Sequence, residues 1–215
     1  MHQSTRAGRN PRPEKVEAVL TAARKLFLTL GYSNTTTDMV QKESGVSKAT
    51  LYNCYGTKES LFAAVIEQEC QVFREVFTEI LPETRSLEKG LYSMGRAYLD
   101  VLVNPDTLDF YRVMVSEAAR FPELASNFLE IGPRTTHSLF TGFIHSHCAT
   151  LSNEQADRFG AMFMSLLRGE MHTRCLLRID YRPSEKELND HATYAVEMVM
   201  RNIEALTRSA GQTRP

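Results

Sequence analysis

Apolar residues recur with the period of a helix along almost the whole chain. From Val16 to Leu30 the apolar positions lie three or four residues apart, which places them on one face of an α-helix. Gly31 follows this stripe, as glycine commonly does where a helix ends. The same period returns in the later segments, and none of them shows the sustained alternation of apolar and polar residues that indicates a strand. The pattern therefore predicts an all-α fold.

Capping and helix-breaking residues divide the chain into nine expected helices. The threonines at 35–37 can cap a helix start, whereas glycines and prolines mark turns and helix ends. The expected helices run over residues 16–30, 35–44, 48–54, 57–81, 87–103, 108–120, 123–148, 152–179 and 184–207. The seventh is expected in two pieces, because Gly132-Pro133 interrupts it.

The segment from residue 31 to 62, GYSNTTTDMVQKESGVSKATLYNCYGTKESLF, holds the most informative pattern. Two short helices separated by a glycine turn, with a longer helix before them, are the parts of a helix-turn-helix. Val40, Val46 and Leu51 are expected to hold the two short helices together. The pattern alone also fits a helical hairpin with a solvated charged face.

The polar residues of this segment suit contact with DNA. Short side chains that would allow close approach to a major groove are Ser47, Lys48, Ala49, Thr50 and Asn53. Longer polar tips that could reach phosphates belong to Tyr52, Tyr55 and Lys58. Thr37 lies at an expected helix N-terminus, where backbone N–H groups favour an anion.

Charge is distributed unevenly along the 215 residues. The 25 Lys and Arg nearly balance the 26 Asp and Glu. Residues 1–60 hold nine basic against five acidic side chains, a net charge of +4, and the rest holds 16 against 21, a net charge of −5. A positive N-terminal quarter suggests that this end meets a polyanion.

The N-terminal segment that contains the predicted helix-turn-helix resembles the DNA-binding domain of the TetR family of transcriptional regulators. The resemblance covers residues 14–65 and rests on Gly31-Tyr32, the threonines at 35–37, Gly45-Val46-Ser47, Thr50-Leu51-Tyr52 and Lys58-Glu59-Ser60-Leu61-Phe62. It implies phosphate contacts for Thr37, Tyr52 and Lys58, and base-facing positions for Ser47, Lys48, Ala49, Thr50 and Asn53. Two residues depart from the family pattern. Cys54 stands where the family often has His or another polar residue, and Tyr55 replaces the usual Phe.

The resemblance also implies a domain organisation. We expect a basic flexible arm over 1–13, the helix-turn-helix domain over 14–60, a helical regulatory and dimerisation domain over 61–208, and a tail over 209–215. Residues 110–133 are similar to the C-terminal domain of AefR-like members, which include repressors of multidrug efflux genes. The family architecture implies a ligand cavity among helices four to seven, and pairing of the last two helices with those of a second subunit.

Large apolar or amphipathic side chains in the helical body are candidates for lining an effector cavity. They are Tyr92, Tyr98, Phe110, Tyr111, Met114, Phe128, His137, Phe140, Phe143 and Met162. At helical spacing any one of them is more often plain core. Such a lining would suit a hydrophobic or amphipathic small molecule.

Two apolar stripes in the last two expected helices are candidates for the dimer interface. They consist of Phe159, Phe163, Leu166 and Leu167 on one helix and Leu188, Ala192, Ala195, Val199, Ile203 and Leu206 on the other. Gly160 is small enough for close helix approach. The alternative is that both stripes face only the core of their own subunit.

No pattern in the sequence indicates catalysis, a metal or a cofactor. The chain lacks the nucleophile, zinc-protease and phosphate-loop motifs. His145 and His147 point to different helix faces, and the four cysteines are far apart in the sequence without metal-ligand spacing. The N-terminus has no apolar run of the kind found in export signals. We expect a cytoplasmic, homodimeric repressor that binds an operator and a small-molecule effector without crossing a membrane, or else an architectural DNA-binding protein without an effector.

Overall fold

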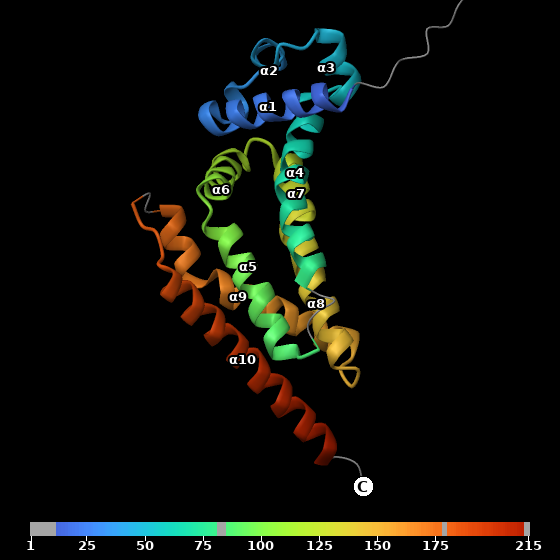
Figure 1. Cartoon of the computed structure of the whole chain (residues 1–215), viewed down its shortest axis with the longest axis vertical. Coiled ribbons are helices and arrows are strands. Elements are labelled where there is room, and N and C mark those ends of the chain that lie inside the picture. Colours follow the sequence, from blue (N-terminus) through green and yellow to red (C-terminus); the bar gives the residue numbers. More distant parts are fainter. Residues whose placement is uncertain (1–11, 81–84, 178–179, 213–215) are drawn as a thin grey trace, which may run out of the picture. The chain divides into compact units, whose positions relative to one another are not determined.

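The computed structural model describes residues 12–80, 85–177 and 180–212 (Figure 1). Within those ranges the regular secondary structure is helical, which confirms the all-α prediction. The chain divides into two compact units, one ending at Ile66 and the other beginning at Glu67. Most of the expected basic arm over 1–13 lies outside the described residues.

The first unit consists of three helices and the start of a fourth. These are α1 (Pro13–Asn34), α2 (Thr37–Ser44), α3 (Lys48–Tyr55) and the first turns of α4 (Lys58–Ile80). Its centre is aromatic: Phe62 meets the rings of Phe27 and Tyr32 edge-on, with centroids 5.0 and 5.2 Å away. Each of these three side chains is at most 1% exposed. Val40, Val46 and Leu51 are also buried, as predicted.

Local capping explains why α2 and α3 are short. Thr36 precedes α2, and its hydroxyl accepts a hydrogen bond from the Met39 N–H at 3.2 Å. Gly45 ends α2 with a φ of 67°, a left-handed conformation that glycine adopts without strain. Ser47 then caps α3 by accepting from the Thr50 N–H at 3.2 Å. The turn and the N-caps of both helices therefore follow from three local signals in the sequence, Thr36, Gly45 and Ser47.

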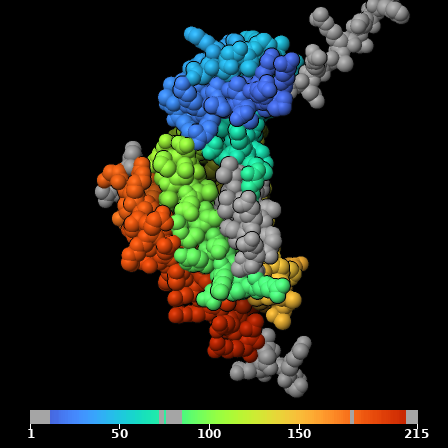
Figure 2. All heavy atoms as spheres, in the orientation of Figure 1, coloured from blue at the N-terminus to red at the C-terminus, as the bar shows by residue number. Residues whose placement is uncertain are grey.

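The second unit contains the remainder of α4 and the helices that follow it. These are α5 (Leu87–Val103), α6 (Pro105–Glu117), α7 (Pro122–Leu129), the π-helical turn η2 (Glu130–Arg134), α8 (Thr135–His147), α9 (Asn153–Leu177) and α10 (Glu185–Gln212). One buried cluster draws apolar side chains from α5, α8, α9 and α10, with Leu99, Phe140, Phe163 and Val199 among its members. Figure 2 shows α10, orange to red, along one side of this unit beside the green α5.

Gly160 brings α8 and α9 close together. A Cβ added there would lie 2.4 Å from the Thr141 hydroxyl oxygen and 3.1 Å from the Thr141 backbone nitrogen. Because a side chain at this position would meet backbone as well as side-chain atoms, the close packing of the two helices requires glycine.

Several helix boundaries differ from the sequence predictions. Helix α1 runs from Pro13 to Asn34 rather than over 16–30, because Gly31 kinks the helix instead of ending it. Helix α6 begins at Pro105 rather than 108, because Asn104 caps it by accepting from the Asp106 N–H at 2.9 Å and proline suits the first turn. The predicted break at Gly132-Pro133 is a π-helical turn that continues directly into α8. Helix α10 runs to Gln212, so the first part of the expected tail is helical. Among the described helices, none has the length and apolar character needed to cross a membrane.

Candidate DNA-binding and effector sites

The start of α2 and the exposed face of α3 form a polar surface on the first unit. The hydroxyls of Thr37 on α2 and Tyr52 on α3 lie 3.3 Å apart, and Tyr52 is 43% exposed. Ala49 and Asn53 are exposed on α3, while Thr50 is partly exposed. Its hydroxyl lies 2.8 Å from that of Ser47. The predicted base-facing and phosphate-facing residues of α2 and α3 therefore come together, although their individual roles stay predictions.

Lys48 has an acidic partner that the sequence analysis did not single out. Its ammonium donates to the Asp38 carboxylate at 2.7 Å, and both side chains are well exposed. The hydrogen bond and the charge of Asp38 raise the pKa of Lys48. The ammonium also lies 5.9 Å from the centroid of the Tyr52 ring. For Lys48 to contact a base, this exposed ion pair must open or rearrange, at small cost because such pairs are weak.

The side chains of Cys54 and Tyr55, at the end of α3, are less exposed than a contact with DNA requires. Both are partly buried. Burial, and secondarily the neighbouring Cys54, raise the pKa of Tyr55 to about 12. Burial also raises the pKa of the Cys54 thiol, which disfavours the reactive thiolate. Tyr55 therefore has a packing role here, and its phosphate contact stays a prediction.

Lys58, the third predicted phosphate contact, has a clear structural role. Its ammonium donates to the backbone carbonyls of Tyr32 at 2.8 Å and Thr35 at 3.0 Å. It also lies 4.2 Å from the centroid of the Tyr32 ring. These carbonyls follow the kink of α1 at Gly31, so Lys58 ties the end of α1 to the start of α4.

Tyr32 and Glu59 form a second link between the same helices. The Tyr32 hydroxyl donates to a Glu59 carboxylate oxygen at 2.9 Å. The pKa of Glu59 is lowered, first by the backbone N–H of its own residue at the start of α4 and next by this hydroxyl. The sequence motif contained both residues, but their pairing across 27 positions gives no local signal.

In the second unit, two predicted effector residues meet an arginine that the sequence analysis missed. Arg168 on α9 donates from Nε to the Tyr98 hydroxyl at 2.8 Å and from Nη2 to the Tyr111 hydroxyl at 2.7 Å. Tyr98 comes from α5 and Tyr111 from α6. Burial is the main cause that raises the pKa of both hydroxyls, so both stay protonated near neutral pH. Three helices thus converge on one cation.

Aromatic rings surround this group. Tyr111 meets the rings of Phe128 and His172 edge-on, with centroids 5.1 and 5.0 Å away. Tyr98 meets Phe140 edge-on at 5.6 Å. Four predicted effector residues therefore belong to one connected cluster. We call it the Arg168 cluster, and it consists of Tyr98, Tyr111, Phe128, Phe140, Arg168 and His172.

His172 is an unusual member of the Arg168 cluster. It is 7% exposed, and its Nε2 has no hydrogen-bond partner among the described residues. Burial, and then the charge of Arg168, lower its pKa to about 4. His172 is therefore neutral near pH 7. The sequence gives no local signal for the position of His172 beside Arg168, because Gly169, between the two residues, has a non-helical backbone (φ 39°) that kinks α9.

The other predicted effector residues do not belong to the Arg168 cluster. Two of them form contacts with neighbouring helices, and the rest are buried or partly buried. The Tyr92 hydroxyl donates to Asn189 on α10 at 3.2 Å, and His137 Nε2 lies 3.1 Å from the Asp157 carbonyl oxygen on α9. These contacts tie both residues to neighbouring helices. Phe110, Met114 and Phe143 are buried, and Met162 is partly buried. Their effector roles stay predictions.

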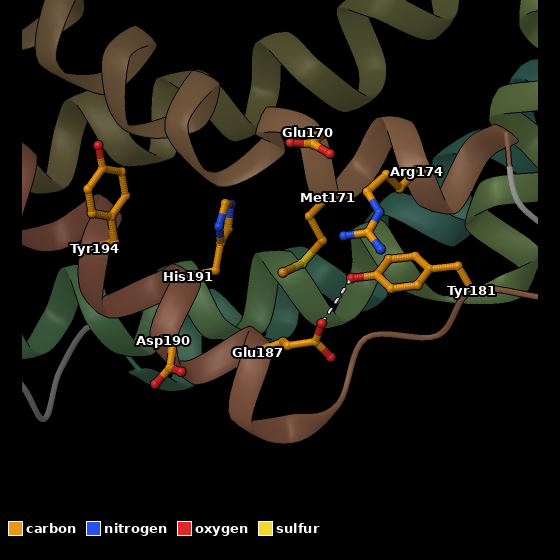
Figure 3. A pocket seen from close by; sticks show the side chains of 8 residues that line it. All are labelled: Glu170, Met171, Arg174, Tyr181, Glu187, Asp190, His191 and Tyr194. Atoms are coloured by element: carbon orange, nitrogen blue, oxygen red, sulfur yellow. Dashed lines mark hydrogen bonds between the residues drawn. The ribbon is translucent and has the colours of Figure 1, made fainter.

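A groove between α9 and α10 has a different character from the expected apolar cavity. Figure 3 shows Met171 and His191 directed into the space between the two helices. Charged groups share the lining, and the Tyr181 hydroxyl donates to Glu187 at 3.3 Å. The lining residues are Glu170, Met171, Arg174, Tyr181, Glu187, Asp190, His191 and Tyr194.

The predicted dimer stripes require a correction. Seven of their residues are at most 5% exposed within a single chain: Phe163, Leu167, Leu188, Ala192, Ala195, Val199 and Ile203. A side chain that is buried in the core of its own subunit cannot also contact a second subunit. These seven residues therefore belong to the core of their own subunit. Phe159, Leu166 and Leu206 are partly exposed, and their interface role stays a prediction.

Comparison with known proteins agrees with this geometry. The family model of the C-terminal domain of AefR-like transcriptional repressors matches residues 89–202, and that of bacterial regulatory proteins of the tetR family matches residues 19–65. The chain is 26% identical over 180 residues to the uncharacterized HTH-type transcriptional regulator YvkB of Bacillus subtilis, covering 81% of this chain and 91% of YvkB.

Two further relatives carry functional descriptions. The HTH-type transcriptional activator FasR of Mycolicibacterium smegmatis is 24% identical over 135 residues, which cover 63% of this chain and 61% of FasR. The solved structure of the flavonoid-responsive regulator FrrA is similar with a TM-score of 0.75 and 29% identity, over 89% of this chain and 97% of FrrA. With two family models that together span both units, the chain belongs to the TetR family of transcriptional regulators, which carry a helix-turn-helix DNA-binding domain.

Proposed function

We propose that this chain is a ligand-responsive repressor that binds a palindromic operator as a homodimer and is released by a hydrophobic or amphipathic effector. The observation that supports DNA binding most strongly is the polar surface of α2 and α3, where Thr37 and Tyr52 lie beside the exposed start of α3. The match to AefR-like repressors supports repression, and control of efflux or catabolic genes is part of the proposal. Its site of action would be the cytoplasm.

The operator is expected to be a palindrome for geometric reasons. One α3 helix reads only a few base pairs, so two copies on half-sites about 34 Å apart, or a multiple of it, are needed for specificity. Within each half-site, Lys48 and Asn53 are proposed to face bases, whereas Thr37 and Tyr52 position the helix on phosphates.

A titration of the operator with single variants tests these roles. Tyr52→Phe removes one hydroxyl and is expected to weaken binding to every sequence alike, because a phosphate contact carries no sequence information. Lys48→Ala is expected to change the preference among operator variants instead. Lys89→Ala, an exposed lysine on α5, is the control for a simple loss of charge. Unchanged operator binding by both Tyr52→Phe and Lys48→Ala would contradict the proposed reading surface.

The dimer is proposed to form through the outer faces of α9 and α10. TetR regulators act as dimers, and Tyr194 on α10 is a large side chain that is 52% exposed in the single chain. Phe159 and Leu166 on α9 are the partly exposed members of the predicted stripe. Sedimentation of the purified chain at micromolar concentration tests this: a monomer would contradict the proposal.

The effector is proposed to act by preferring a conformation that does not fit the operator. A 100-fold loss of operator affinity requires a preference of about 2.7 kcal/mol between the two conformations, which lies within the usual range of allosteric coupling. The test is release of operator DNA by a panel of lipophilic compounds. Release by none, with no ligand-induced rise in melting temperature, would favour an architectural DNA-binding protein without an effector.

A further inference from the structure

Arg168 has an environment unlike that of Arg96 and Arg112, the other arginines of the second unit that are partly buried among the described residues. Arg96, with a side chain 16% exposed, pairs with Asp100 and Glu185 at 2.9 Å each. Arg112, at 29%, pairs with Asp109. Arg168 is also partly buried, yet in the described parts of the chain its partners are two neutral hydroxyls and no carboxylate. A guanidinium keeps its charge near neutral pH, so among the described side chains this cation has no carboxylate counter-ion.

The Arg168 cluster also has hydrogen-bond donors in excess. A guanidinium has five N–H groups, and the two tyrosine hydroxyls accept from two of them, which leaves three. Arginine cannot accept a hydrogen bond, so the Tyr111 hydroxyl must direct its own proton elsewhere. His172 adds a buried Nε2 without a partner among the described residues. In the tautomer that carries its proton on Nε2, His172 is a further donor beside Arg168 and Tyr111.

Phe128 and Phe140 give this polar group an apolar border. Phe128 contacts the Tyr111 ring and Phe140 contacts the Tyr98 ring, both edge-on. A ligand that suits both features has an anionic head and an apolar body. A carboxylate fits the head position because its two oxygens match the fork of a guanidinium.

We propose that Arg168, Tyr111 and His172 bind the carboxylate of an amphipathic acid. This inference rests on the proposed effector function and narrows it to one ligand class, which includes both fatty and aromatic acids. Arg168 supplies the charge and a pair of N–H donors. Tyr111 and neutral His172 each donate a hydrogen bond to the same head group.

Binding of matched acids and alcohols to the full-length chain tests this assignment without DNA. The aliphatic pair is decanoate and 1-decanol, and the aromatic pair is 2-naphthoate and 2-naphthylmethanol. By calorimetry, at least one acid is expected to bind about 10-fold more tightly than its alcohol, as loss of one charge-assisted interaction would predict. The pair that shows this preference identifies the source of the carboxylate.

Three variants separate a binding role for Arg168 from a structural one. Arg168→Gln is expected to reduce the acid preference to about 2-fold or less, because only the charged head group loses its partner. Arg158→Gln, on an exposed arginine of the same helix, is expected to retain the preference. Tyr111→Phe keeps the ring and removes one hydroxyl, so it provides a milder test should Arg168→Gln fail to fold. It is expected to weaken acid binding and leave alcohol binding unchanged.

The outcomes distinguish this inference from the proposed function. If alcohols bind as tightly as acids and release the operator, the carboxylate assignment is wrong and the effector function stands. If acid preference persists in both Arg168→Gln and Tyr111→Phe, the head group binds elsewhere. If none of the four compounds binds while operator binding is intact, the carboxylate assignment is overturned, and the wider lipophilic panel then decides the effector function.

Discussion

His172 should make the stability of the chain depend on pH in a defined direction. Its folded-state pKa is lowered from 6.5 to about 4, by burial and then by the charge of Arg168. At pH values between about 4 and 6.5, His172 is therefore protonated in the unfolded chain and neutral in the folded chain. The unfolding free energy keeps its full value above about pH 6.5 and decreases as the pH falls toward 4, because protonation of His172 favours the unfolded chain. Linkage gives a loss of about 2 kcal/mol between pH 7 and pH 5 from this group alone.

Urea unfolding of wild type and His172→Met at pH 7 and pH 5 measures this effect. Methionine fills a similar space without a titrating group, so the variant should lose about 2 kcal/mol less unfolding free energy than wild type on acidification. Thr173→Ala, at the exposed neighbouring position, should lose as much as wild type. Equal acid losses for wild type and His172→Met would refute the reasoning that burial keeps His172 neutral.

Three other substitutions test the packing and assembly described above. Phe140→Ala, which empties a fully buried position between Tyr98 and Phe163, should lower the unfolding free energy by about 3–5 kcal/mol in urea denaturation; a loss below about 1 kcal/mol would contradict its place in the core. Gly160→Val should cost about 1–3 kcal/mol by the same assay, because its side chain meets Thr141, and a neutral result would show that α8 and α9 separate easily. Tyr194→Asp should produce folded monomers in sedimentation, whereas Glu204→Gln on the same helix should not; a dimeric Tyr194→Asp would place the interface elsewhere.

The parts of the fold that sequence analysis predicted well are those encoded locally. Gly45 and Ser47 mark the turn between α2 and α3 because a left-handed residue and a capping hydroxyl act on their immediate neighbours. Local signals do not predict a helix end correctly where a change in helix type lets the chain continue past a proline. Pro133 is accommodated by the π-helical turn before α8, so a residue that usually ends a helix here does not.

One candidate site is encoded locally in the sequence, and the other is formed by residues far apart in it. The polar surface of α2 and α3 follows from one short motif. The Arg168 cluster joins residues 57 and 70 positions apart, so spacing alone could not reveal that Arg168 meets Tyr98 and Tyr111. Periodicity likewise identified the apolar stripe containing Val199 but could not say which partner covers it. Burial within one chain answers that question in favour of the subunit's own core.

The central claim is that the exposed face of α3 reads an operator, and selection from a random DNA pool tests it most directly. Purified wild-type chain should enrich an inverted repeat whose half-site centres lie about 34 Å apart or a multiple of it. Ala49→Glu, which places a carboxylate on the exposed face of α3, should abolish that enrichment through repulsion by phosphates. Enrichment of no sequence by wild type, or of the same repeat by Ala49→Glu, would contradict the claim.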